Sequence, residues 1–100
     1  MHRGNPWAPL EDAKNVLRST LSMIDDQHPG VDVGGEVMRG NPGKMLTETA
    51  AHSRAAMLVV GSRGQGGFQS LLMGSVSHHC LHHATTAVVV VTAPTNVAQE

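Results

Sequence analysis

Two glycine-containing segments of this sequence have the residue types and spacing of an anion-binding loop. Gly61 and Gly64 follow the apolar run 57–60, and Gly74-Ser75 comes after nine further residues. An apolar run that ends in glycine, crosses a glycine-rich loop and restarts at Gly-Ser is typical of a strand, a loop and a helix. A helix start carries unpaired N–H groups and about half a unit of positive charge, and glycine lets an anion approach the backbone. The pattern therefore predicts a phosphate-binding loop, with a nucleotide as the favoured ligand.

Other phosphate-binding and nucleophile motifs do not fit this sequence. The P-loop motif needs a lysine before its Ser or Thr, but Ser75 directly follows Gly74. The dinucleotide-binding fingerprint fails because Gln69 stands where the third glycine belongs. The sequence has no Gly-x-Ser-x-Gly elbow. Since neither a nucleophile–base set nor an acid pair is recognisable, the sequence predicts a binding protein rather than an enzyme.

Four histidines surround the single cysteine of the chain, at positions 78, 79, 82 and 83 around Cys80. At this spacing His78 with His82, and His79 with His83, could each clamp a metal ion from one helix face. The two pairs point in different directions and no acidic ligand is near in sequence. A structural role is therefore favoured, and we assign no metal site from the sequence. Cys80 is expected to be a small core or interface residue, with a redox switch as the alternative.

Composition and charge narrow the class of protein. A chain of 100 residues is one small domain at most, and its net charge of −1 with 2% aromatic residues does not favour nucleic-acid binding. No run approaches the ~20 apolar residues that span a bilayer, and residues 1–6 lack the apolar core of a signal peptide. A single cysteine suits a reducing compartment. We expect a cytoplasmic protein without a membrane partner.

The periodicity of apolar residues predicts an α/β fold. Residues 1–9 form an irregular lead-in, 10–92 the domain, and 93–100 a tail. We expect a helix from Leu10 to the stop signal at 28–30, followed by a strand over 31–38 that Gly34-Gly35 weakens. A second helix is expected from Pro42 to about residue 53, with Asn41 as its cap. A strand at 57–61, a helix at 74–83 and a strand at 87–91 complete the expected order. The unbroken apolar runs at 57–60 and 87–91 predict strands covered on both faces. This order predicts a parallel sheet with flanking helices.

The spacing Gly61-x-x-Gly64, nine residues, then Gly74-Ser75 resembles the Gly-2x-Gly-9x-Gly-Ser/Thr signature of the universal stress proteins. The segments 37–42, 58–64, 74–77 and 81–84 and the valine run 88–91 follow in that family's order. The resemblance covers about residues 10–92. It implies a Rossmann-like fold of the adenine-nucleotide alpha hydrolase type and a role in stress signalling.

The resemblance also implies a ligand, ATP, with at most slow hydrolysis. In nucleotide-binding members of the family, this loop and helix start cradle the phosphates. By position, Gly61 and Gly64 let the backbone bend around the phosphates, and Arg63 adds a charge-assisted contact. The helix start supplies N–H groups and hydroxyl donors from Gly74, Ser75, Val76 and Ser77. In the alternative interpretation, the glycines only shape a tight connection.

The sequence departs from the family at its N-terminal side. Family domains begin with a strand that bears an aspartate for the base or ribose region, and this chain starts after that strand, its helix and the second strand. We therefore expect an N-terminally truncated version with three strands and without the adenosine-side contacts. The two missing strands lie in the middle of the family sheet. Their loss predicts unpaired edges and a destabilised or partner-dependent product.

A second function from a different class stays open. In the family the valine-rich last strand commonly forms the dimer contact, and Ala87–Val91 resembles that strand. The chain could thus be an interaction fragment that forms a homodimer through this strand without binding a nucleotide.

Overall fold

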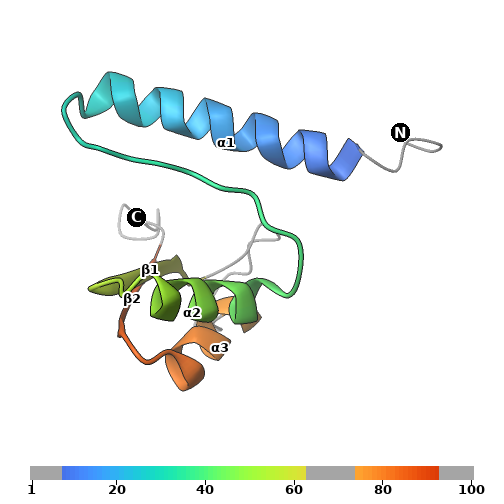
Figure 1. Ribbon diagram of the computed structural model, residues 1–100, viewed down its shortest axis with the longest axis vertical. Helices are drawn as coiled ribbons and strands as arrows, with labels where there is room; N and C mark the ends of the chain where they lie inside the picture. The colour runs from blue at the N-terminus through green and yellow to red at the C-terminus, as the bar shows by residue number, and fades with distance from the viewer. Residues whose placement is uncertain (1–7, 63–73, 93–100) are drawn as a thin grey trace, which may run out of the picture. The chain divides into compact units, whose positions relative to one another are not determined.

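The computed structural model describes residues 8–62 and 74–92. These residues form α1 (Ala8–Gln27), α2 (Pro42–His52), β1 (Met57–Gly61), α3 (Ser75–His83) and β2 (Ala87–Val91) (Figure 1). The chain divides into two compact units, Met1–Met38 and Arg39–Glu100. The first unit contains α1, and the second contains all the other elements.

The first unit combines α1 with the segment that follows it. One face of α1 is half-buried, formed by the side chains of Leu10, Ala13, Leu17, Leu21 and Ile24, whereas Val16, which the spacing of apolar residues also suggests for this face, is 66% exposed. After α1 ends, Gly30 takes a φ of +96°, and the chain turns back along the helix (Figure 1). A positive φ is unfavourable for residues with a Cβ, so glycine suits this turn.

The predicted strand over 31–38 is wrong. The structure assigns no strand there, and the described part of the chain contains a sheet of β1 and β2 alone. A strand needs a ladder of hydrogen bonds to a second strand, and within the described residues that ladder joins β1 to β2 alone. Gly35 instead lies against α1, since a Cβ at this position would come within 2.5 Å of Cδ1 of Leu17. Gly35 therefore serves a close approach to a helix rather than a strand, whereas the surroundings of Gly34 are open.

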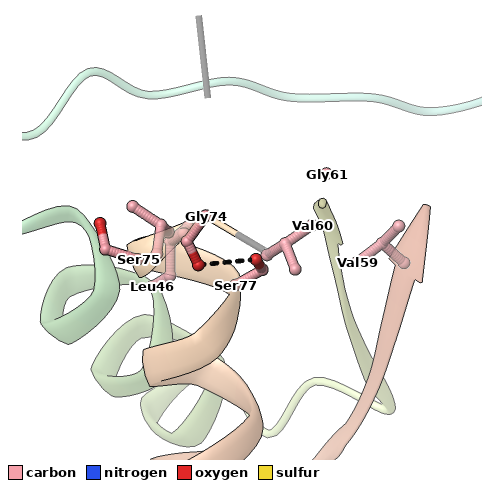
Figure 2. A pocket seen from close by; sticks show the side chains of 8 residues that line it. Leu46, Val59, Val60, Gly61, Gly74, Ser75 and Ser77 are labelled. Carbon is pink, nitrogen blue, oxygen red and sulfur yellow. Dashed lines mark hydrogen bonds between the residues drawn. The ribbon is translucent and has the colours of Figure 1, made fainter. Parts of the chain in front are cut away.

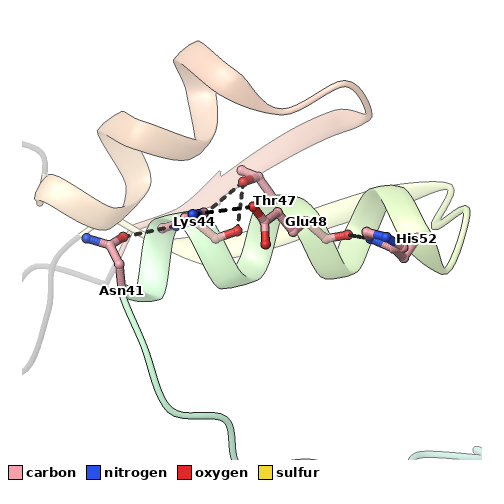
Figure 3. A network of polar contacts seen from close by, with 6 residues as sticks. Asn41, Lys44, Thr47, Glu48 and His52 are labelled. Atoms are coloured by element: carbon pink, nitrogen blue, oxygen red, sulfur yellow. Dashed lines mark hydrogen bonds and ion pairs between the residues drawn. The ribbon is translucent and has the colours of Figure 1, made fainter.

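Local signals define the start of α2 as the sequence predicts. The side chain of Asn41 accepts a hydrogen bond from the Lys44 N–H at 3.0 Å, and Pro42 occupies the first helical position. Further polar contacts lie along this helix at exposed or half-buried positions (Figure 3). Among them, Lys44 Nζ lies 3.9 Å from Glu48 Oε2, the Thr47 hydroxyl donates to Gly43 O at 3.1 Å, and His52 Nδ1 lies 2.8 Å from Glu48 O. Exposed pairs of this kind stabilise a helix by a few tenths of a kcal/mol.

The end of α2 is a Schellman motif with a non-glycine residue at its left-handed position. The Arg54 N–H donates to Ala51 O at 3.2 Å, and the Ala55 N–H donates to Ala50 O at 3.0 Å. Arg54 has a φ of +53°, which is costly for a residue with a Cβ. Ala50 belongs to the buried core cluster of this unit, and Ala55 packs against that cluster. The motif thereby directs the chain from α2 into β1.

The sheet of the second unit is parallel. Strands β1 and β2 pair in register from Met57 with Ala87 to Gly61 with Val91, and α3 forms the crossover between them. Parallel strands require such a crossover. The predicted α/β class with a parallel sheet and flanking helices is confirmed, and the sheet within residues 8–62 and 74–92 has two strands instead of the three expected.

The core of this unit lies between α2, α3 and one face of the sheet. Its buried residues are Ala50 of α2, Leu58 and Val60 of β1, and Cys80 of α3. Cys80 is fully buried, as the sequence predicts. Around them pack the half-buried residues Ala55, Val76, Ala84, Val88 and Val90.

The expectation of strands covered on both faces is wrong for the described residues. Along β1 the burial alternates, with Leu58 and Val60 buried and Met57 and Val59 exposed. Val59 is 55% exposed and Val91 of β2 is 52% exposed. Ala50 of α2 and Cys80 of α3 share one core with Leu58 and Val60, so both helices described in this unit pack on the same face of the sheet.

Candidate functional site

The candidate site lies where β1, β2 and α3 meet. The Ser62 N–H, one residue after β1, donates to Val91 O at 2.8 Å. The carbonyl of Ser62 accepts a hydrogen bond from the Gly74 N–H at 2.6 Å. Ser62 therefore ties the carboxyl ends of both strands to the residue that precedes α3.

Within the part of the chain that the structure describes, the start of α3 has no side-chain cap. Gly74 is the N-cap, with an extended backbone, and it makes no side-chain hydrogen bond to the helix. By helix geometry, the N–H groups of the first turn have no acceptor within the helix. The start of α2 differs, because there the Asn41 side chain takes one of these N–H groups. The first turn of α3 is thus the helix start that an external anion could cap.

One pocket brings together residues that the sequence singles out. Gly61, Gly74, Ser75, Val76 and Ser77 all line a cavity of about 360 Å³ (Figure 2). Leu46, Val59 and Val60 complete its wall. The predicted residues thus come from the end of β1 and from the first turn of α3, as the motif implies. Arg63 and Gly64, the other two predicted residues, lie outside the described part of the chain.

The two serines of the pocket differ in what their hydroxyls do. Ser77 is 1% exposed, and its hydroxyl donates to Gly74 O at 3.1 Å and to Ser62 O at 3.3 Å. Its side chain therefore fixes the helix start and is not directed to a ligand. Ser75 is exposed, so its hydroxyl is the one that a ligand could reach.

Among the described residues, the charge at the pocket comes from the backbone. None of the eight described residues that line it carries a charged side chain. A smaller cavity of about 230 Å³ shares Ser75 and Val76 with the first and is lined also by Asn41, Pro42, Gly43 and His79. The starts of α2 and α3 therefore lie at the same end of this unit. Each contributes partial positive charge there, which favours an anion over a cation.

No group of the described residues offers an obvious nucleophile or a closed metal site. Burial raises the pKa of the Cys80 thiol, so this cysteine stays protonated and unreactive. Within residues 8–62 and 74–92, no three His, Cys, Asp or Glu side chains gather so as to hold a metal ion together. None of the described helices combines the length and hydrophobicity that a membrane span requires.

Sequence reasoning did not include Leu46, Val59 and Val60 among the site residues. Val59 and Val60 directly precede Gly61, so their place at the end of the strand is a signal that could have found them. Leu46 belongs to α2, and its place in the wall depends on how α2 packs against α3 and β1 (Figure 2). No local pattern encodes that packing.

This arrangement defines a Rossmann-like α/β protein whose pocket lies at the carboxyl ends of parallel strands, where proteins of this architecture bind their ligands. Comparison with known proteins gives the family. The family model described as "Universal stress protein family" matches residues 5–92. The chain therefore belongs to the universal stress protein family, and this membership supports a role in the stress response.

Individual relatives agree with this assignment. The chain is 38% identical to a universal stress protein of Mycolicibacterium smegmatis over 88% of its own length and 30% of the relative's. It is 36% identical to a universal stress protein of Synechocystis over 64% of its own length and 59% of the relative's. It is 35% identical to one of Mycobacterium tuberculosis over 87% of its own length and 29% of the relative's. The chain thus spans about a third of the two mycobacterial relatives. No solved structure matches it significantly.

Proposed function

We propose that this chain is an ATP-binding module of the stress response that works by binding rather than by catalysis. One observation carries the proposal: Gly61, Gly74, Ser75, Val76 and Ser77 line a single pocket at a helix start without a side-chain cap. The volume of about 360 Å³ lies within the range of about 300–1,000 Å³ that is usual for small-molecule sites. The cytoplasm is the compartment in which we propose that the module acts.

The phosphates of ATP are the part of the ligand that this pocket suits. Backbone N–H groups of Ser75, Val76 and Ser77 would donate to phosphate oxygens, and the Ser75 hydroxyl would add a further donor. Gly61 and Gly74 would allow a close approach to the backbone. Arg63 and Gly64 complete the proposed set, with the guanidinium supplying the full positive charge that the lining residues lack.

This placement predicts weak discrimination between bases. The contacts proposed for the described residues all go to phosphates. ATP and GTP carry the same phosphates, so their dissociation constants for this chain should lie within about threefold of each other.

Titration of the nucleotide against wild type and Gly74→Asp tests the proposal. A carboxylate at the start of α3 would cap the helix itself and repel phosphate, so affinity should fall at least about tenfold, a loss of 1.4 kcal/mol or more. Gly34→Asp is the matched control, since it adds the same charge at a glycine whose surroundings are open. If wild type and Gly74→Asp bind equally well, or neither binds, the proposal fails.

A second candidate function is homodimerisation through β2, and the exposure of its side chains favours it. Val89 and Val91 are exposed, and within the described residues β2 pairs on one side only, with β1. An apolar strand with a free edge can pair with a second copy. Light scattering of wild type and Val89→Lys tests this candidate. A dimer that persists unchanged in Val89→Lys would argue against this strand as the interface.

A further inference from the structure

The histidines of α3 form two pairs of neighbouring rings. The ring centroids of His78 and His82 lie 4.4 Å apart with the planes tilted by 48°. Those of His79 and His83 lie 4.3 Å apart with a tilt of 32°. The sequence alone favours structural roles for these residues. The ring contacts add that each histidine lies directly beside the one a single helical turn away.

We propose that His78 and His82 form a two-ligand binding site for a divalent transition-metal ion of the Zn²⁺, Ni²⁺ and Cu²⁺ group. Imidazole nitrogen suits these ions, and two histidines at positions i and i+4 of a helix can bind the same ion. Both side chains are exposed, so a hydrated ion can reach them without opening the core. This site is independent of the nucleotide pocket proposed above.

The surroundings of the other pair explain why we choose His78 and His82. His79 is half-buried at the contact between α2 and α3, where a Cβ on Gly43 would come within 2.8 Å of its Cγ. Its ring is thus held by packing, and turning it toward a metal ion would disturb that contact. The exposed pair carries no such restraint. Its larger tilt is also closer to chelation, because a metal ion lies near the plane of each imidazole that binds it and two parallel stacked rings cannot share one.

The proposed site is an open one with two protein ligands. Among the described residues no third His, Cys, Asp or Glu joins a cluster that could hold a metal ion. Cys80 lies between the two histidines in sequence but is fully buried, so its sulfur faces the core. Water or an external ligand would occupy the remaining positions. We therefore expect reversible binding, with Cu²⁺ tightest in accordance with the general order of divalent affinities.

Binding would also stabilise the end of α3. The helix has nine residues, and an ion shared by His78 and His82 joins two of its successive turns. A ligand that binds the folded state alone raises the free energy of unfolding by mass action. The melting temperature of the protein should therefore rise with the concentration of Cu²⁺.

Calorimetric titration of the full, untagged chain with Cu²⁺ tests the site. We expect one tight ion per chain in the wild type. His78→Asn and His82→Asn should each weaken binding by about tenfold or more, the scale on which changes at a metal site reduce affinity. The double variant should bind little worse than either single variant, because one substitution already breaks the chelate. The exposure of both residues makes folded variants the expected outcome, and circular dichroism checks this.

His52→Asn is the matched control. His52 also lies on a helix, but Glu48 and Ala56 stand four residues to either side, so no second imidazole is within one turn. Its substitution should leave Cu²⁺ affinity and the rise in melting temperature unchanged. The proposal is overturned if His52→Asn or His83→Asn weakens binding as much as His78→Asn. It is also overturned if the losses in His78→Asn and His82→Asn simply add, since independent single-histidine sites would behave in that way.

Discussion

His79 packs its imidazole directly on the backbone of Gly43, and this contact sets how closely α2 and α3 approach. A Cβ at position 43 would lie 2.8 Å from Cγ and 2.9 Å from Cβ and Cδ2 of His79. These distances are shorter than any ordinary carbon–carbon contact. The contact lies beside the pocket that both helix starts line, so it also positions the first turn of α3.

Gly43→Ala should therefore lower the free energy of unfolding by about 1 to 3 kcal/mol, the usual cost of overpacking. Chemical denaturation measures this loss. Gly34→Ala is the control, because its added methyl group meets no atom within 4 Å. The double variant Gly43→Ala/His79→Ala should recover part of the loss. Equal stability of Gly43→Ala and wild type would contradict the packing described here.

Ser77→Ala should destabilise the protein by about 1 kcal/mol, because the buried hydroxyl would no longer donate to the Gly74 and Ser62 carbonyls. Ser75→Ala is the matched control, since it makes the same exchange two residues earlier at an exposed position. The small gain in helix propensity from alanine is similar in both variants. Thermal melts measure the stability of both variants. If Ser75→Ala loses as much stability as Ser77→Ala, the role assigned to the Ser77 hydroxyl is wrong.

Arg54→Gly should stabilise the protein, by about 0.5 to 1 kcal/mol. Arg54 holds a φ of +53° at the end of α2, and glycine takes this conformation without the steric cost of a Cβ. Ser53→Gly is the contrasting variant, because Ser53 has a φ of −85° and its hydroxyl donates to Thr49 O at 2.8 Å. That substitution should destabilise. Urea denaturation separates the two outcomes, and a less stable Arg54→Gly would contradict the motif.

Cys80 should resist thiol reagents in the folded protein and contribute to a loss of stability at alkaline pH. Burial raises the pKa of its thiol above the ordinary value of 9.0, so the folded state keeps a proton that the unfolded state releases. The stability from this group is fully present below the unfolded pKa and is lost as the pH rises through the folded pKa. The rate at which a thiol reagent labels Cys80, measured with and without denaturant, tests the expected resistance. Cys80→Ala should flatten the alkaline fall in stability, and equal labelling rates in both states would refute the assignment.

The elements that the sequence predicted correctly are those with local signals. Asn41 and Pro42 mark the start of α2 through a cap and a fixed φ, and both lie where the sequence predicted. The segment 31–38 lacks such a signal, since a strand depends on a partner far away in sequence. The unbroken valine run likewise cannot tell whether one face or both faces of a strand are covered. That depends on where the helices pack.

The same distinction holds for the candidate site. Gly61 and Gly74 were predicted because glycine and its spacing reflect the local needs of a loop and a helix start. Leu46 could not be predicted as a site residue, since it reaches the pocket only through the packing of α2 against other elements. Ser77 was predicted as a hydroxyl donor to a ligand, and its hydroxyl instead bonds within the protein. The backbone N–H of Ser77 remains one of the donors that we propose for the phosphates.

The hydrogen bond between Ser62 and Gly74 has a consequence for substitutions in the residues between them. The Gly74 N–H donates to Ser62 O at 2.6 Å, and both atoms belong to residues outside 63–73. Because both partners are main-chain atoms, this bond does not depend on the side chains of positions 63–73. Sequence changes there should therefore leave the end of β1 joined to the start of α3.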